Sequence, residues 1–203
     1  MKKLFLASVM PFTIEKLIKF LPKSPQELTI AFIPTAADPY EDKWFIKSDR
    51  DEFVKKGFQI KDVDINGKTE QELRYEFKDI DIIFVAGGNT FYLLQKAKES
   101  GFGKIAKELV EKGVIYVGAS AGAVLAGTTI EVARPFDDPA EAPKLKSFEG
   151  LNLVEFAVLP HFDKKSEQIC EKLIKEAAEK GYKAIPITNQ QAIVVNGDKY
   201  EIA

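Results

Sequence analysis

The sequence predicts an α/β fold in which helices cover both faces of a mostly parallel sheet. Short apolar runs rich in Ile, Val and Phe alternate with amphipathic stretches along the chain, an order typical of parallel sheets. The apolar runs carry no polar residues at alternate positions, so we expect their strands to be covered on both sides. Near the end of the chain, Asn196-Gly197 separates two short runs and predicts an antiparallel hairpin.

The position of each element follows from its local pattern. We expect strands over residues 3–7, 29–34, 58–63, 81–85, 114–118 and 184–187, and helices over residues 12–21, 40–56, 69–77, 90–99, 104–112 and 166–180. The last helix has the clearest apolar face and ends at Gly181. Segments 192–195 and 199–202 form the predicted hairpin.

Length and composition indicate one compact domain over residues 1–203, since 45% of the residues are hydrophobic and 30% are charged. Two lysines precede the first apolar run and imitate a signal peptide, but the run is short and Pro11 ends it. We therefore interpret residues 3–7 as a buried first strand. No apolar stretch approaches the ~20 residues that a membrane span needs.

Charge and cysteine content narrow the classes of partner. The 29 basic and 31 acidic residues nearly balance, which gives no electrostatic reason to expect binding to nucleic acid or to an anionic membrane. A small peptide or small molecule is the expected substrate, and the sequence leaves a homodimer open. The single cysteine, Cys170, excludes an intrachain disulfide and favours the cytoplasm. With one His and one Cys, a metal site is not expected.

The most informative motif is Gly118-Ala-Ser-Ala-Gly122, which follows a buried strand and precedes a helix. This is the nucleophile-elbow pattern in its proper context, because the tight turn demands tiny neighbours and projects Ser120 above the strand end. A small-residue turn that binds phosphate is the alternative interpretation.

A second turn, Gly87-Gly88, also lies between a strand and a helix, and Thr90 is a candidate cap for that helix. An amide there could form half of an oxyanion hole, although a plain glycine loop explains the pattern equally.

His161 is the only histidine, so a Ser-His pair leaves no other choice of base. It follows an apolar run and Pro160, at a predicted strand end where open α/β sheets carry their functional groups.

The irregular segment 131–150 contains three prolines and is expected to act as a lid or substrate loop.

These motifs together resemble the aspartyl dipeptidase branch of peptidase family S51, known as peptidase E, which is related to cyanophycinase. The resemblance runs nearly end to end and rests on segments 31–35, 86–90, 118–123, 150–153 and 160–162. It implies a class I glutamine-amidotransferase-like fold, Ser120 as nucleophile and His161 as base. It also implies Gly88 and Ala121 amides as the oxyanion hole, no cofactor, and cleavage of dipeptides after an N-terminal aspartyl residue.

The chain departs from the family at the residue that orients the histidine. Where relatives often carry a glutamate, Asn189 stands here, and an asparagine can fix the imidazole tautomer without charge. Asp137, Asp138 and Glu149 are alternative partners. For the aspartyl side chain, Arg134 is the candidate ligand, since arginine holds carboxylates bidentately.

Three functions are therefore considered. The leading hypothesis is a serine dipeptidase; an amidohydrolase or isopeptidase acting on another acidic amide, as in cyanophycinase, is the second. The third is a binding protein of weak activity on the same scaffold, which the neutral Asn189 would favour.

Overall fold

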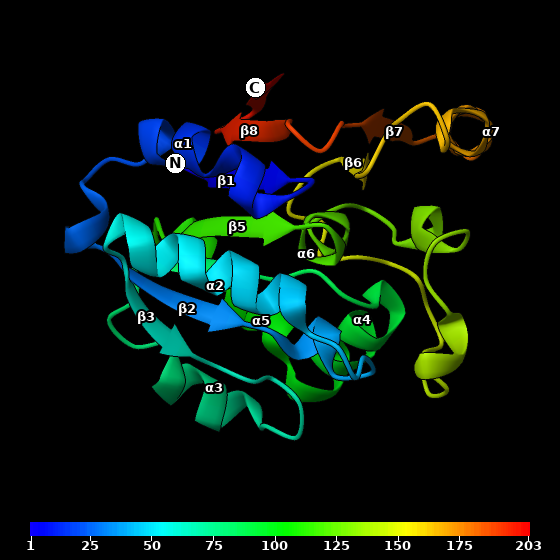
Figure 1. Ribbon diagram of the computed structural model, residues 1–203. Helices are drawn as coiled ribbons and strands as arrows, with labels where there is room; N and C mark the ends of the chain where they lie inside the picture. Colours follow the sequence, from blue (N-terminus) through cyan, green and yellow to red (C-terminus); the bar gives the residue numbers. More distant parts are fainter.

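A seven-stranded sheet forms the centre of the protein, whose computed structural model describes residues 1–203 (Figure 1). Its strand order is β3-β2-β4-β5-β1-β8-β9. The strands are β1 (Lys3–Ala7), β2 (Thr29–Ile33), β3 (Gln59–Asp62), β4 (Ile82–Val85), β5 (Ile115–Ala119), β8 (Ala192–Asn196) and β9 (Lys199–Ile202). The first five are parallel, and β8 and β9 form the C-terminal antiparallel hairpin beside β1. The predicted sheet and hairpin are confirmed.

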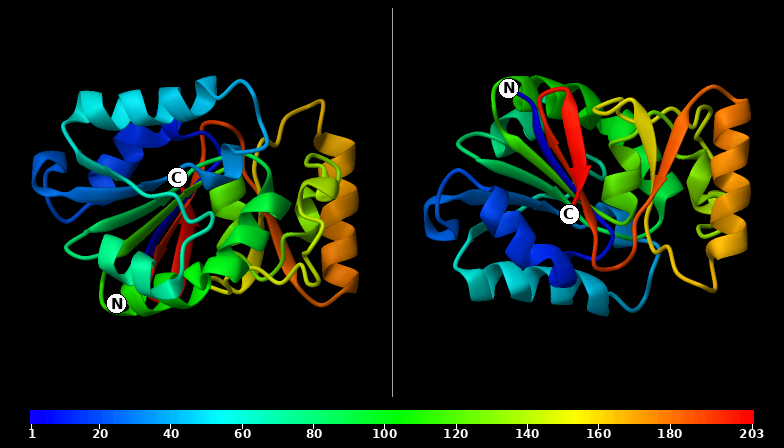
Figure 2. Two further views of the ribbon diagram at one scale, coloured as in Figure 1. Left: turned by 90° about the horizontal axis from the view of Figure 1, so that it is seen from below. Right: turned by 90° about the horizontal axis from the view of Figure 1, so that it is seen from above.

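Helices cover both faces of this sheet, as the apolar strands require (Figure 2). Helices α1 (Met10–Phe20) and α2 (Trp44–Lys56) pack on one face, where Phe32, Phe53 and Phe84 meet in the core. The opposite face carries α3 (Glu70–Glu76), α4 (Thr90–Ser100), α5 (Phe102–Glu111) and α6 (Ala121–Leu125). None of these helices combines the length and apolar character needed to cross a bilayer.

A second, two-stranded sheet lies beside the main one. The strand predicted over residues 184–187 belongs to this small sheet and not to the main one. Strands β6 (Phe156–Leu159) and β7 (Lys183–Pro186) pair in parallel with each other, and α7 (Glu167–Glu179) packs on β7 at that end of the molecule (Figure 2). The edge of the main sheet beside β1 is already taken by β8. The segments that carry His161 and Asn189 therefore approach the main sheet from this smaller one.

The strand order brings several chain turns to one edge of the sheet. Strands β4, β5 and β1 are neighbours, so the residues that follow Val85, Ala119 and Ala7 emerge side by side. Strand β8 runs the other way, with Ala192 opposite Ala7, so the residues before it reach the same edge. In sheets of this class ligands bind beyond the carboxyl ends of the strands.

The turn between β5 and α6 is packed so closely that side chains have no room. A Cβ on Gly118 would lie 2.4 Å from the Gly122 carbonyl oxygen, and one on Gly122 would lie 2.0 Å from that of Val85. Both obstacles are backbone atoms, which cannot move aside without disturbing neighbouring strands. The glycines of the elbow motif thus allow α6 to pack against the ends of β4 and β5.

We predict that Gly122→Ala destabilises the protein by at least about 1–3 kcal/mol, since overpacking a rigid site costs that much. Urea unfolding measures the change. The matched control is Gly103→Ala in α5, where a new Cβ would meet only the end of the flexible Leu151 side chain. Equal stability of the two variants would contradict the close packing at the turn.

Candidate active site

Ser120 occupies the turn between β5 and α6 in a strained backbone conformation. Its φ is +49° and its ψ is −113°, a region that residues other than glycine rarely adopt. Hydrogen bonds hold it there: the Ser120 amide donates to the Ala7 carbonyl at 3.0 Å, and the Ser120 carbonyl accepts from Ala123 and Val124. The conformation directs the hydroxyl away from the strand and toward His161.

The structure brings Ser120, His161 and Asn189 into one hydrogen-bonded line. Ser120 Oγ lies 2.8 Å from His161 Nε2, and Asn189 Oδ1 lies 2.9 Å from His161 Nδ1. An amide oxygen can only accept, so this arrangement places the ring proton on Nδ1 and leaves Nε2 free to accept the serine proton.

Ser8 completes the arrangement, and the sequence analysis missed it. Its hydroxyl accepts from the His161 amide at 2.8 Å and donates to Asn189 Oδ1 at 3.2 Å. It also lies 3.3 Å from His161 Nδ1. Ser8 is 1% exposed and follows β1 directly. Its place after a central strand beside β5 was the only signal that could have identified it.

The backbone of His161 is also in the left-handed region, with φ +62°. For a residue other than glycine this is uncommon and requires support from the surroundings. The amide of His161 donates to Ser8, the amide of Phe162 donates to the Ile187 carbonyl at 3.0 Å, and the His161 carbonyl accepts from Ser166 Oγ. These bonds fix the imidazole above the end of the main sheet.

The Gly87-Gly88 turn lies against Ser120 on the side of β4. A Cβ on Gly87 would approach the Ser120 Cβ to 3.2 Å. Gly88 has φ +140°, and a Cβ there would lie 2.1 Å from the Ala36 carbonyl oxygen. The Gly88 amide donates no backbone hydrogen bond, and the Ala121 amide begins α6, where first-turn amides lack partners within the helix.

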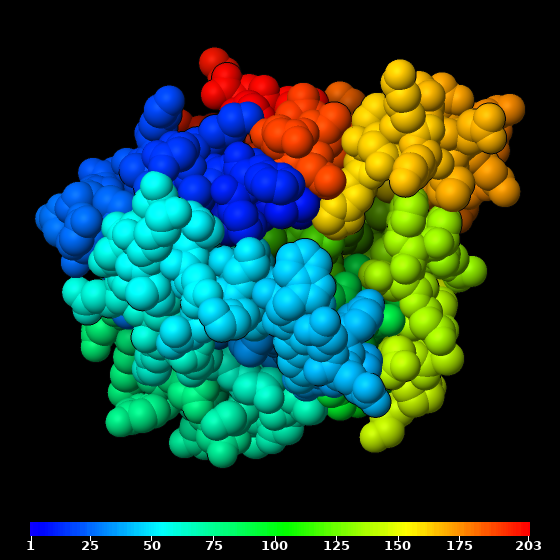
Figure 3. All heavy atoms as spheres, in the orientation of Figure 1, coloured from blue at the N-terminus to red at the C-terminus, as the bar shows by residue number.

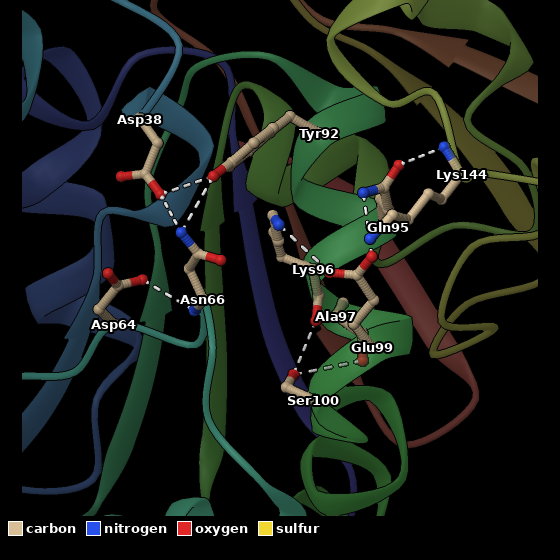
Figure 4. Close-up of polar contacts among 10 residues, drawn as sticks. All are labelled: Asp38, Asp64, Asn66, Tyr92, Gln95, Lys96, Ala97, Glu99, Ser100 and Lys144. Carbon is tan, nitrogen blue, oxygen red and sulfur yellow. Dashed lines mark hydrogen bonds and ion pairs between the residues drawn. The ribbon is translucent and has the colours of Figure 1, made fainter.

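A polar cluster fixes the segment on which Gly88 rests (Figure 4). Asp38 Oδ2 accepts from both Tyr92 Oη and Asn66 Nδ2, at 3.0 and 3.2 Å. Thr35 donates to Asp64 at 2.7 Å, and the Asn89 amide donates to the Ala36 carbonyl at 2.8 Å. These contacts join the chain after β2 to α4 and hold the glycine turn in place.

The N-terminus of α4 binds the irregular loop of residues 131–150. The Asn89 side chain caps the helix by accepting from the Tyr92 amide, so the expectation that Thr90 is the cap was wrong. Thr90 instead donates to Asp137 Oδ2 through both its amide and its hydroxyl, at 2.9 and 2.5 Å. Farther along the helix, Gln95 accepts from the Lys144 amide (Figure 4). The loop is thereby anchored with Asp137 near Ser120.

A cleft of about 390 Å³ opens in front of Ser120 and His161. The hollow is visible in Figure 3 between the chain that follows β1, the segment before α2 and the loop that holds Asp137. Its walls are mainly aromatic and apolar, formed by Met10, Tyr40, Trp44, Phe45 and Phe136. Two acidic residues, Asp49 and Asp137, also line it. No lysine or arginine lines it.

The structure does not bring Arg134 to this cleft. The turn at Glu131–Ala133 directs the Arg134 guanidinium onto the ring of Phe148, at 4.7 Å, and the residue lines a different hollow beside α7. The other acids considered for His161 are also engaged elsewhere. Asp138 accepts from the Ala140 amide, and Glu149 accepts from the side chain of Asn152.

A model of peptidase family S51 matches residues 8–203, which is nearly the whole chain. The chain belongs to peptidase family S51. It is accordingly a peptidase, and therefore a hydrolase.

Relatives of this S51 peptidase align over most of its length. An uncharacterized peptidase of Listeria monocytogenes is 33% identical over 97% of this chain and 96% of its own length, and one of Pasteurella multocida is 33% identical over 98% and 95%. A Drosophila melanogaster protein named probable alpha-aspartyl dipeptidase is 31% identical over 87% of this chain and 73% of its own length. A crystal structure of a Listeria monocytogenes protein bearing the name peptidase E superposes with a TM-score of 0.91, at 31% identity, over 100% of this chain and 98% of that one.

The two carboxyls of the cleft are unlike those elsewhere on this S51 peptidase. Burial raises the pKa of Asp49 to about 7, and Asp49 has no hydrogen-bond or ion-pair partner. Burial also raises the pKa of Asp137, against the opposing effects of the Thr90 hydrogen bonds and the charge of His161. No group of three or more His, Cys, Asp and Glu side chains gathers anywhere in a way that could hold a metal ion.

We predict that Asp49→Asn stabilises the protein at pH 8 but not at pH 4. The unfolded chain releases the Asp49 proton near its ordinary value of 3.8, whereas the folded protein releases it near 7. Stability therefore falls as pH rises through this window, by up to about 4 kcal/mol. Asparagine removes that penalty.

Urea unfolding at the two pH values measures the effect. Asp51→Asn, on the same helix but exposed and paired with Lys47, is the control and should change little at either pH. If Asp49→Asn were less stable than the parent protein at pH 8, the buried carboxyl would be stabilising and the interpretation would fail.

Proposed function

We propose that this S51 peptidase hydrolyses small peptides through Ser120 as nucleophile and His161 as general base. The observation that carries the proposal is the 2.8 Å contact between Ser120 Oγ and His161 Nε2, in a cleft at the carboxyl end of the sheet. The contact is within the range that proton transfer requires. The strained φ of Ser120 supports the same role, because such strain gathers at functional sites.

The reaction proceeds by acyl transfer. Ser120 Oγ attacks the peptide carbonyl carbon as its proton passes to His161 Nε2, and the same proton then protonates the departing amine as the C–N bond breaks. Water repeats the sequence on the acyl-enzyme, giving its proton to His161 and releasing the carboxylic product with Ser120 restored. Both attacks, by Ser120 and by water, require Nε2 to begin unprotonated, as the hydrogen bond from Nδ1 to Asn189 favours.

The amides of Gly88 and Ala121 stabilise the oxyanion in this proposal. Both turns border Ser120, and neither amide is consumed by the backbone hydrogen bonds of the fold. An N–H pair aimed at the developing charge costs no reorganisation during the reaction. The partial positive charge of a short helix such as α6 adds little, so the two amides themselves are the principal donors.

Asn189 acts as the orienting group. As a neutral amide it fixes the tautomer and direction of the ring but adds no charge to stabilise the imidazolium. Ser8 supports it by donating to the same oxygen, which leaves both Asn189 and the His161 amide held by one hydroxyl. The neutral partner favours a slower enzyme. The alternative, a binding protein of weak activity on the same scaffold, predicts little turnover.

A substrate the size of a dipeptide suits a cleft of about 390 Å³. The Drosophila relative is named for aspartyl dipeptides, and that name is the support for the same preference here. An aspartyl side chain, or another acidic amide as in the cyanophycinase-like alternative, needs a cation nearby. The cleft lining supplies none, and Arg134 lies on Phe148. The proposed function is therefore the reaction and the peptide class, and the aspartyl preference stays a prediction.

Ser120→Ala is expected to lower kcat for dipeptides by at least about 10³-fold while leaving the unfolding midpoint unchanged, because the turn already accommodates residues of this size. Hydrolysis is followed by release of free amino acids. Ser24→Ala, at an exposed turn outside the cleft, is the control and should retain full turnover. Near-parental turnover by Ser120→Ala would remove Ser120 from the nucleophile role.

Asn189→Ala is expected to lower kcat about 10- to 10³-fold with little change in stability, because His161 loses the acceptor for its Nδ1 proton. Asn189→Asp retains an acceptor and adds a charge that favours the imidazolium, so the acid limb of its kcat/KM profile should move to higher pH. A structural role for Asn189 would not move that limb. Unchanged kcat in Asn189→Ala would show that another group orients the ring.

A further inference from the structure

Asp49 is the carboxyl of the cleft that has no hydrogen-bond or ion-pair partner in the protein, whereas Asp137 is bound by Thr90. It lies on the inner side of α2 and is 7% exposed, whereas the helix's other acids, Asp51 and Glu52, form ion pairs at the surface. Asp49 accepts no hydrogen bond from any residue. A buried carboxyl without a partner is costly, and one that persists in a cleft calls for a functional explanation.

The carboxyl of Asp49 opens toward the cleft. Among the side-chain nitrogen and oxygen atoms that are fully enclosed, only the Thr128 hydroxyl lacks a hydrogen-bond partner. The Asp49 oxygens also lack a partner, so they are not fully enclosed and still touch open space. That space is the cleft that Asp49 lines together with Ser120 and His161. A molecule bound in front of Ser120 can therefore reach these oxygens.

The charge of the cleft is negative once Asp49 is ionised, above its pKa of about 7. Asp137 is the second acid in its lining. Burial raises the pKa of Tyr40, and the nearby charges of Asp137 and Glu141 raise it further, so Glu141 also lies close to the cleft. Lys43, beside Trp44 in the sequence, points to Asp38 at 4.0 Å and does not line the cleft. An anionic substrate group would meet like charges here, whereas a cation would meet a free acceptor.

The aromatic walls favour the same kind of group. Trp44 and Phe45 meet edge to face at 6.0 Å, and Tyr40 meets Phe45 at 5.8 Å, so that three aromatic rings line the cleft with Asp49. Aromatic faces attract ammonium groups as well as apolar side chains. A carboxylate gains nothing from such a wall.

We propose that Asp49 binds a substituted ammonium group of the substrate, so that the cleft selects peptides by positive charge rather than by an aspartyl side chain. This rests on the proposed peptidase site at Ser120. Two sources have this chemistry, the free α-ammonium of the peptide's first residue and the side chain of a lysyl residue. The free energy lost by burying Asp49 is recovered when the cation binds.

The test measures binding to the Ser120→Ala protein, where no turnover occurs, by calorimetry at pH 8. Four peptides separate the sources: Ala-Ala has only the α-ammonium, acetyl-Lys-Ala only the lysyl group, acetyl-Ala-Ala neither, and Asp-Ala adds the aspartyl side chain. We expect one or both of the first two to bind at least about 10-fold more tightly than acetyl-Ala-Ala. The peptide that does so identifies the source.

Adding Asp49→Asn to the Ser120→Ala protein should abolish the preference for the cationic peptide. The Kd of the favoured peptide should rise about 10-fold, and that of acetyl-Ala-Ala should not change. Asp51→Asn is the matched control and should leave every Kd unchanged. The proposal would be overturned if Asp-Ala bound most tightly of the four peptides. It would also be overturned if the favoured peptide had the same Kd with and without Asp49→Asn. The binding result is independent of catalysis, so failure of Ser120 as a nucleophile and failure of Asp49 as a ligand remain distinguishable.

Discussion

The position of the His161 imidazole is the constraint on which the rest of the site depends. Ser120 follows a strand of the main sheet, whereas His161 follows a strand of the small sheet, so no local geometry guarantees their contact. The contact is made because Ser8 accepts from the His161 amide, while Asn189 lies opposite Nδ1. Both residues emerge at the same edge, since β1 and β8 run antiparallel with Ala7 opposite Ala192. The sheet register thus determines where the ring lies.

Two strained backbone conformations are the cost of this arrangement. Ser120 and His161 both have positive φ, and neither is glycine. Ser120 is held by backbone hydrogen bonds and by the close packing of Gly122 against Val85 and of Gly88 against Ala36. The backbone of His161 is held by the side chains of Ser8 and Ser166. The buried, unpartnered Asp49 adds a third unfavourable feature. That all three border one cleft indicates that stability has been exchanged there for function.

Much of this could be predicted from the sequence because it follows from local rules. Tiny residues around Ser120 predict a tight turn, the apolar run before His161 predicts a strand, and Asn-Gly before the last strand predicts a hairpin. Most of what could not be predicted depends on long-range pairing. The separate pairing of β6 and β7 and the contacts of Ser8 are set by partners far away in the chain. The cap at Asn89 is local, but Thr90 beside it is also a capping residue type. The stacking of Arg134 on Phe148 depends on how the irregular loop folds back on itself. Asp49 sits in an ordinary charged helix by sequence, and only the fold buries it.

The most direct test of the central claim, that His161 activates Ser120, is reaction with a fluorophosphonate followed by peptide mapping in a mass spectrometer. Such a reagent phosphonylates only an activated nucleophile, with loss of fluoride, and the chain contains several other serines as internal controls. The account predicts one adduct, on Ser120, whose rate of formation falls sharply in His161→Ala and is unaffected by Ser24→Ala. Labelling of a different residue, or an unlabelled Ser120 in a protein that still cleaves peptides, would contradict it.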